Sequence, residues 1–305
     1  MKVFLTGATG YIGSVVAEEL QKAGHRVIGL ARNQAAADLL ASRHIEPVIG
    51  DVRTPAPLAQ QAKEADGVIH TAFLHEMADF AEASRIDGDL IEALGEALVG
   101  TNKPLVVSSA SGVLGDTGDQ SVDETASIPR DFGPAVRAAS EDSAWKVAER
   151  NVRSSVIRLP AFPHGRGGSV LVPLLIQSAL RSGTSYYIGT GENKTSAVHV
   201  EDAARLYVLA LEKAPAGSLY HAASESSLTI KSIADSIARL TGRSTASLSQ
   251  EQAFTVLGGF VGTLLAINSQ LNGTKARNEL GWQPTGLSLF EDIEHGTYRQ
   301  FVPQQ

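Results

Sequence analysis

The chain has 305 residues, a formal net charge of −7 and no cysteine. The acidic balance and the scattered Lys and Arg residues argue against a nucleic-acid surface. The missing thiols exclude a disulfide framework, thiol catalysis and a zinc–thiolate site. Because 43% of the residues are hydrophobic, the chain can bury a sizeable core. We therefore expect a globular protein with neither a nucleic-acid partner nor a bound metal.

The apolar segments of the chain predict no membrane span. The first apolar run is broken by Thr6, Gly7 and Gly10, too early for a secretory signal. The segment Phe254–Ile267 is interrupted by glycines such as Gly258 and falls short of the roughly 20 residues that a bilayer requires. We expect a buried or lid-like helix there, and a cytoplasmic protein.

In the first half of the chain, short apolar runs alternate with longer helical patterns. This alternation is typical of βαβ units, which form a doubly wound parallel sheet. The expected strands are Val3–Thr6, Arg26–Leu30, Pro47–Ile49, Gly67–His70, Leu105–Ser108 and Ser155–Leu159. The expected helices are Tyr11–Ala23, Gln34–Ser42, Phe80–Val99 and Ala135–Asn151.

The pattern changes after Arg158, where prolines and glycines form a turn-rich segment with less regular elements beyond it. We predict an α/β Rossmann domain over residues 1–160. Residues 161–305 are expected to form a smaller C-terminal substrate lobe that packs on it and is not an independent domain. The helices expected in this lobe are Ser169–Arg181, Glu201–Glu212, Ile230–Thr241 and Leu287–Phe301.

The strongest local signal is a glycine turn between the first strand and the first helix. It reads Thr6-Gly7-Ala8-Thr9-Gly10-Tyr11-Ile12-Gly13. A dinucleotide pyrophosphate must approach backbone N–H groups at a helix N-terminus, and side chains obstruct that approach. Gly7 suits the tight turn, Gly10 the close contact, and Gly13 the packing of helix on strand. Thr9, Tyr11 and Ile12 complete the expected cofactor contacts in this turn.

Arg32 lies at the end of the second predicted strand, where an NAD-binding domain usually has an acidic residue for the ribose. A guanidinium instead matches a 2′-phosphate, so the sequence favours NADP(H), although a solvent-facing arginine is the alternative. Asp51 and Val52 follow the third strand and are also expected at the cofactor. Asp51 either accepts a hydrogen bond from the adenine edge or caps the next helix.

Over nearly its whole length the chain resembles an extended short-chain dehydrogenase/reductase of the NAD-dependent epimerase/dehydratase type. The resemblance implies that His70, Thr71 and Ala72 line the cofactor channel and that Ser108 and Ser109 face the nicotinamide. Besides the glycine turn, it rests on Asp51-Val52, Val68-Ile69-His70-Thr71-Ala72, Val106-Val107-Ser108-Ser109-Ala110-Ser111, Arg158-Leu159-Pro160, Val198-His199-Val200-Glu201-Asp202-Ala203-Ala204 and Leu280-Gly281-Trp282-Gln283-Pro284.

The chain departs from this family at the catalytic Tyr-x-x-x-Lys motif. If Glu141 matches the glutamate that commonly follows the motif, Gly133 replaces the tyrosine and Arg137 the lysine. There is no tyrosine anywhere between Tyr11 and Tyr186. The group that would protonate a developing alkoxide is therefore missing from its usual place.

Three residues are candidates for what remains of the catalytic site. Ser109 keeps the carbonyl-orienting position, with Ser108 and Ser111 as rivals because the local alignment can slip by one. Asp87 falls where relatives carry a structural asparagine. Arg137 keeps a positive charge for the nicotinamide ribose or a substrate oxyanion, but it cannot act as an acid.

His164 and Lys194 are expected on the substrate side, together with Ser111. His164 is a candidate proton donor, because an unperturbed imidazole titrates near 6.5, although a loop histidine is commonly a turn residue.

We interpret the chain as an NADP(H)-dependent oxidoreductase, monomeric or homodimeric, acting on a small carbonyl or hydroxyl compound that is sugar-like or steroid-like. A non-catalytic NADPH sensor and a nucleoside-diphosphate-sugar epimerase or dehydratase are the alternatives.

Overall fold

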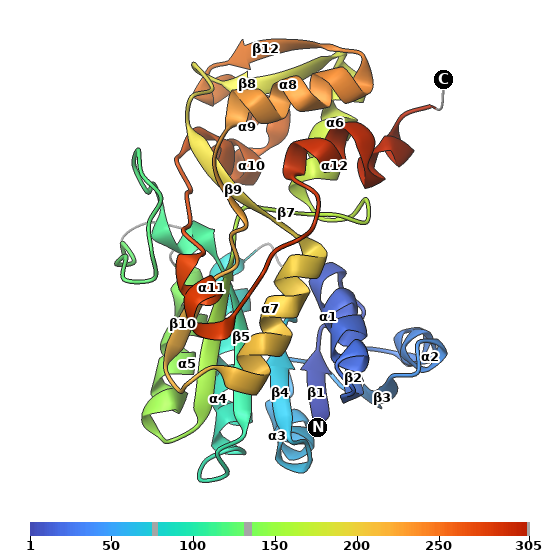
Figure 1. The fold of residues 1–305 in the computed structure, drawn as a ribbon, viewed down its shortest axis with the longest axis vertical. Helices are drawn as coiled ribbons and strands as arrows, with labels where there is room; N and C mark the ends of the chain where they lie inside the picture. The colour runs from blue at the N-terminus through green and yellow to red at the C-terminus, as the bar shows by residue number, and fades with distance from the viewer. Residues whose placement is uncertain (75–78, 131–135, 304–305) are drawn as a thin grey trace.

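The computed structural model of the chain describes residues 1–74, 79–130 and 136–303. Figure 1 shows a larger body built around a parallel sheet, with a smaller lobe above it formed by the second half of the chain. The N-terminus lies in the larger body, whereas the C-terminus lies in the upper lobe.

The larger body is a seven-stranded parallel sheet with the strand order β10-β6-β5-β4-β1-β2-β3. The chain builds outward from β1 in both directions, which confirms the predicted doubly wound Rossmann-type sheet. The strands are β1 (Lys2–Thr6), β2 (Arg26–Ala31), β3 (Glu46–Ile49), β4 (Gly67–His70), β5 (Pro104–Ala110), β6 (Arg153–Leu159) and β10 (Ser218–His221).

Helices cover both faces of this sheet because successive strand residues point to opposite sides. In β1, Val3 and Leu5 pack in one apolar core, whereas Phe4 packs in the other. The first core lies against α1 (Tyr11–Lys22), α2 (Gln34–Ser42) and α7 (Val200–Lys213), and the second against α3 (Pro55–Glu64), α4 (Phe80–Glu96) and α5 (Ala138–Glu149).

The upper lobe has two small sheets and its own apolar core. Strands β11, β9 and β7 form one sheet, and β12 pairs with β8 in the other. The strands of the lobe are β7 (Phe162–His164), β8 (Thr184–Ile188), β9 (Lys194–His199), β11 (Glu225–Thr229) and β12 (Ser244–Leu248). Its helices are α6 (Leu171–Ser182), α8 (Ile230–Thr241), α9 (Gln250–Leu257), α10 (Gly259–Ala266), α12 (Leu289–His295) and the 3₁₀ helix η3 (Thr297–Phe301).

The chain crosses between the two bodies more than once. After entering the upper lobe it returns to the larger body, where α7 packs on α1 and β10 pairs with β6. Helix α11 (Thr274–Leu280) also contributes to the core beneath the sheet. Residues beyond 160 thus complete the larger body as well as forming the upper lobe.

Two long helices expected in the second half are each broken by a glycine. Gly258 has φ 86° and separates α9 from α10, so Phe254–Ile267 is a helical hairpin rather than one helix. Gly296 similarly ends α12 before η3 begins. No helix among the described residues is both long and apolar enough to cross a membrane.

Candidate functional site

The candidate site lies where β1 and β4 end side by side in the sheet. The strand order reverses between these two strands, and ligands of doubly wound sheets bind in the crevice outside such a point. Thr6 is the register partner of His70, so the glycine turn after β1 lies next to Thr71 and Ala72 after β4. The structure thus brings together two groups of residues that the sequence predicts for the cofactor.

The surroundings of the three glycines of the turn differ, and so does the effect that a side chain would have at each. Gly7 has φ 74°, and a side chain there would come within 2.6 Å of the Thr71 hydroxyl. A side chain at Gly13 would overlap the carbonyl oxygen of Gly7. At Gly10, the N-cap of α1, the nearest atom to an added Cβ is the Gly7 oxygen at 3.2 Å. Internal packing therefore explains Gly7 and Gly13, whereas a side chain at Gly10 would meet a single backbone oxygen at the helix N-terminus.

The other residues of the turn divide between solvent and protein. Thr9 is exposed at the tip of the turn, and Ile12 is half-buried against the core. Tyr11 points toward the upper lobe, where its hydroxyl donates to the carbonyl oxygen of Gly165 at 2.9 Å. The side chain of Tyr11 therefore links the two bodies, while its backbone begins α1.

Arg32 lies directly after β2 and is exposed. Within the described ranges no hydrogen bond or ion pair holds its guanidinium. The next residue, Asn33, caps α2 by accepting from the N–H of Ala36 at 2.9 Å. The cation thus stands free at the end of the strand, where the sequence predicts a 2′-phosphate contact.

Asp51 and Val52 follow β3 and differ in their surroundings. Asp51 accepts from the backbone N–H of Arg53 at 2.8 Å and pairs with its guanidinium at 3.2 Å. Val52 is buried in the core on the α3–α4 side of the sheet. The carboxylate of Asp51 is half-exposed, so it keeps acceptor capacity beyond this local turn.

A chain of buried hydrogen bonds begins beneath the glycine turn. The Thr6 hydroxyl lies 2.6 Å from Nδ1 of His70, and Nε2 of the same ring lies 3.0 Å from Asp87. Thr6 also accepts from the N–H of Ala72 at 3.3 Å, which leaves its own proton for Nδ1. This arrangement fits a His70 ring that carries its proton on Nε2 and donates to Asp87.

Asp87 and Arg137, both predicted for the catalytic site, form an ion pair at 2.5 Å. Ser140 donates to the same carboxylate, and Arg137 also donates to the Ser108 carbonyl at 3.2 Å. Burial alone would raise the pKa of Asp87, but Arg137 and then His70 hold it below its usual range. The guanidinium packs 3.9 Å from the Phe73 ring centre. Arg137 is therefore a buried, fixed cation at the end of β5.

Ser108 and Ser109 are adjacent in β5 and bond to different parts of the protein. Ser108 donates to the His70 carbonyl at 2.9 Å and accepts from the Tyr207 hydroxyl at 2.8 Å. Ser109 donates to Glu141 of α5 at 2.6 Å. Both serines are buried, so in this conformation neither hydroxyl is free to bind a substrate carbonyl.

The partner of Ser109 is itself part of a buried ion pair. Arg158 of β6 donates to both oxygens of Glu141, at 2.8 and 2.7 Å, and neither side chain is more than 3% exposed. Such a bidentate pair satisfies both charges without solvent. It also forms one wall of a groove of about 950 Å³ between α5, α11 and residues 123–128. The glycine turn does not line this groove.

Ser111 and Lys194 lie where the two bodies meet at the segment following α10. Ser111 accepts from the Ser269 hydroxyl at 2.9 Å, and both are buried. The Lys194 carbonyl accepts from the N–H of Ser269 at 2.8 Å, and its side chain is half-buried. Ser111 thus joins the bodies through its hydroxyl, and Lys194 through its backbone.

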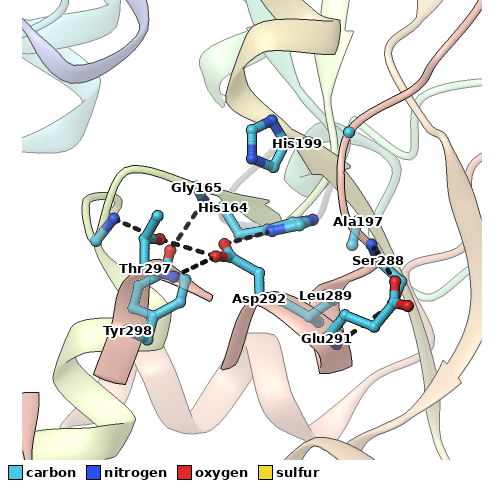
Figure 2. Close-up of polar contacts among 12 residues, drawn as sticks. His164, Gly165, Ala197, His199, Ser288, Leu289, Glu291, Asp292, Thr297 and Tyr298 are labelled. Atoms are coloured by element: carbon cyan, nitrogen blue, oxygen red, sulfur yellow. Dashed lines mark hydrogen bonds and ion pairs between the residues drawn. The ribbon is translucent and has the colours of Figure 1, made fainter. Parts of the chain in front are cut away.

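His164 belongs to β7 of the upper lobe and is fully buried. Figure 2 shows its ring facing Asp292. Its Nδ1 is 3.0 Å from Asp292. Its Nε2 has no hydrogen-bond partner among the residues that the structure describes, and it lies 3.8 Å from Glu225. Burial lowers the pKa of His164, but the two carboxylates outweigh it and raise the pKa above 6.5. A side chain with no exposed surface does not meet substrate in this conformation.

Sequence reasoning did not single out Glu141 and Arg158 as partners of Ser109, or His70 as a link from the turn to Asp87. A charged residue inside a buried strand, as Arg158 is next to the last residue of β6, was the available signal. The predicted tyrosine position, Gly133, lies outside the described residues. Within the described part of the chain no cluster of three His, Asp or Glu side chains is arranged to hold a metal.

The fold and the glycine turn define a protein of the extended short-chain dehydrogenase/reductase type. The chain belongs to the NAD dependent epimerase/dehydratase family, whose model matches residues 3–223.

Among its relatives, an uncharacterised protein of Schizosaccharomyces pombe is 40% identical over 98% of this chain and 100% of its own length. A ketoreductase of Stigmatella aurantiaca, which acts on a farnesyl-dihydroquinoline oxide, is 27% identical over 72% of this chain and 67% of that protein. The structure of a dTDP-glucose 4,6-dehydratase from Streptomyces venezuelae superposes with a TM-score of 0.80. The superposition covers 99% of this chain and 97% of the dehydratase. At 23% sequence identity it supports only the similarity of fold.

Proposed function

We propose that the protein is an NADP(H)-dependent oxidoreductase acting on a small carbonyl or hydroxyl compound. The observation that carries the proposal is the open N-terminus of α1 at Gly10, at the switch point of the sheet. Its free N–H groups and the helix dipole suit a pyrophosphate. Gly7 and Gly13 shape the turn, so the residues present fit a dinucleotide.

The choice of NADP(H) over NAD(H) rests on Arg32. An exposed guanidinium that has no partner in the described part of the chain is available to a 2′-phosphate, and a phosphate pairs well with its planar fork. An acidic residue, which would accept from the ribose 2′-hydroxyl, is missing from that strand end.

The bound nicotinamide would supply or accept a hydride. The chain's contribution is then to orient the reactants and to stabilise charge at the ends of β4 and β5. Arg137 suits the second task because Asp87, Ser140 and the Ser108 carbonyl hold it in place. An arginine side chain does not serve as a general acid, so the proton that a developing alkoxide needs must come from another group. Ser109 can orient a carbonyl only if its bond to Glu141 opens.

The ketoreductase relative supports a reductase of lipophilic carbonyl compounds, which agrees with a steroid-like substrate. Epimerases and dehydratases of nucleotide sugars rank lower, because they depend still more on the missing tyrosine. One observation favours the second candidate, a sensor that binds NADPH without turnover. Ser109, Asp87 and Arg137 are all engaged in internal bonds.

Two measurements test the proposal in order. Nicotinamide fluorescence titrations should show NADPH binding more tightly than NADH. A screen of aldehydes, ketones and keto sugars with NADPH then separates enzyme from sensor. Turnover of an apolar ketone supports the oxidoreductase, whereas tight NADPH binding without any turnover would establish the sensor. Failure to bind either dinucleotide refutes both.

A further inference from the structure

Residues Gly165-Arg166-Gly167-Gly168, here named the GRGG loop, lie between the glycine-turn helix and the C-terminal segment. Three consecutive residues have left-handed φ angles: Gly165 at 112°, Arg166 at 55° and Gly167 at 62°. Such a backbone is costly for the arginine and persists where surrounding contacts hold it. Those contacts come from two sides.

On one side, the GRGG loop rests on a single face of α1. The Tyr11 hydroxyl donates to the Gly165 carbonyl at 2.9 Å, and the Tyr11 ring fills the space where Gly168 lacks a side chain. Two turns further along α1, Glu18 accepts from Arg166 at 2.9 Å. Residues seven apart share a helix face, so the loop follows α1 from its first residue.

On the other side, the loop is held by η3, near the end of the chain. The Tyr298 hydroxyl accepts from the Gly165 N–H at 3.3 Å and donates to the Gly168 carbonyl at 2.8 Å. The Thr297 hydroxyl accepts from the Gly167 N–H at 2.8 Å. Two adjacent side chains thus satisfy three backbone groups of the loop.

The C-terminal residues are in turn anchored by the buried pair of His164 and Asp292. Figure 2 shows Asp292 lying between His164 and Thr297 and bonded to both. One Asp292 oxygen lies 3.0 Å from His164, and the other accepts from the Thr297 N–H at 2.9 Å and its hydroxyl at 2.8 Å. β7 ends at His164, directly before the GRGG loop. The His164–Asp292 pair therefore fixes the start of the loop and also Thr297 of η3, which holds the loop from the other side.

We propose that Tyr298 and Thr297 are positioning residues for the dinucleotide, acting on the glycine turn through the GRGG loop and Tyr11. The inference rests on the proposed function, because it places the dinucleotide at the turn. Tyr11 is the first residue of α1 and follows Gly10, so holding its ring holds the helix end whose N–H groups meet the phosphates. A preorganised site loses less freedom on binding and so binds more tightly.

The test compares three tyrosine variants of the full-length protein. Tyr298→Phe removes the hydroxyl that bonds the loop but keeps the buried ring, and Tyr11→Phe removes the other hydroxyl. Tyr220→Phe is the matched control, because this buried tyrosine donates to Glu279 at 3.0 Å, away from the loop. NADPH affinity is measured by fluorescence. Hydrogen exchange of residues 10–14 is followed in the free protein at Gly10 and Ser14, whose N–H groups donate to the carbonyls of Gly7 and Gly10 at 2.8 and 2.9 Å.

We expect Tyr298→Phe to weaken NADPH binding about threefold to tenfold, the equivalent of one lost hydrogen bond, and to speed exchange at residues 10–14. Tyr220→Phe should change neither, even if it lowers the melting temperature as much. The double variant of Tyr11 and Tyr298 should lose less than the sum of the single effects, because both act on one loop.

Unchanged affinity and exchange in Tyr298→Phe, with NADPH still bound by the wild type, overturns the positioning role and leaves the proposed function standing. Equal effects of Tyr220→Phe and Tyr298→Phe overturn it as well, because they indicate only general destabilisation. A wild-type protein that binds no dinucleotide refutes the proposed function itself.

Discussion

Replacing Gly10 by valine should abolish dinucleotide binding while leaving the protein folded. Gly10 has φ −80° and ψ 172°, a conformation that any L-residue adopts. The nearest atom to an added Cβ is the Gly7 carbonyl oxygen at 3.2 Å, a tight contact that a shift of a few tenths of an ångström in the turn would relieve. Loss of a glycine N-cap to a branched residue costs on the order of 1 kcal/mol of stability. A branched side chain at the helix N-terminus would, however, occupy the place of the pyrophosphate.

We expect the affinity of Gly10→Val for NADPH to fall at least about 100-fold, or roughly 2.7 kcal/mol. Fluorescence titration gives the affinity, and a thermal melt verifies the fold. Gly13→Ala is the contrasting variant, because its Cβ would overlap the Gly7 carbonyl and should destabilise the protein itself by about 1–3 kcal/mol. Full NADPH affinity in a folded Gly10→Val protein would refute this account of the turn.

Three further predictions follow from the site and the upper lobe. Arg32→Glu should reverse or erase the preference for NADPH over NADH, since a lost charge-assisted phosphate contact is worth about 1.5–3 kcal/mol; equal wild-type affinities for the two dinucleotides would contradict it. Ser109→Ala should lower the free energy of unfolding by about 1.5–3 kcal/mol, because Glu141 loses a buried hydrogen-bond donor. NADPH affinity should stay unchanged. An unaltered melting temperature would contradict the bond between Ser109 and Glu141. A fall in turnover beyond that thermal effect would give Ser109 the carbonyl-orienting role. The raised pKa of His164 predicts stability that is fully present below about pH 6.5 and is lost as pH rises through the folded-state pKa. Burial, and then the nearby His164, lower the pKa of His199, so His199 affects stability in the opposite direction. The contribution of His164 is therefore measured as the difference in unfolding free energy between wild type and His164→Asn, in urea melts across pH.

The sequence predicts the glycine turn well because its determinants are local. Three glycines with the right spacing lie between an apolar strand and an amphipathic helix. Gly7 and Gly13 make room for contacts within the turn and with Thr71, which follows the neighbouring strand β4. The helix Ile230–Thr241 is predicted to the residue for a similar reason. Thr229 caps its first turn, and Gly242 ends it in a left-handed conformation.

The bonding partners within the site were not predictable, because they are distant in sequence. Asp87 and Arg137 are 50 residues apart, and His164 and Asp292 are 128 apart. Both residues of each pair are individually plausible as catalytic or surface groups. Only the topology of the sheet and the return of the C-terminal segment show that each charge is neutralised by a buried partner.

These buried pairs bear on the departure from Tyr-x-x-x-Lys that the sequence analysis predicts. That prediction places Arg137 where the motif has its lysine, and Asp87 where a structural asparagine is expected. In the structure they form one ion pair, closed by Ser140 and by His70, whose other nitrogen contacts Thr6 next to the glycine turn. A buried guanidinium without a carboxylate would be strongly destabilising, and so would the carboxylate alone. The two charges therefore depend on each other for stability. Together they keep a fixed cation at the end of β5, joined by hydrogen bonds to the turn that would bind the dinucleotide.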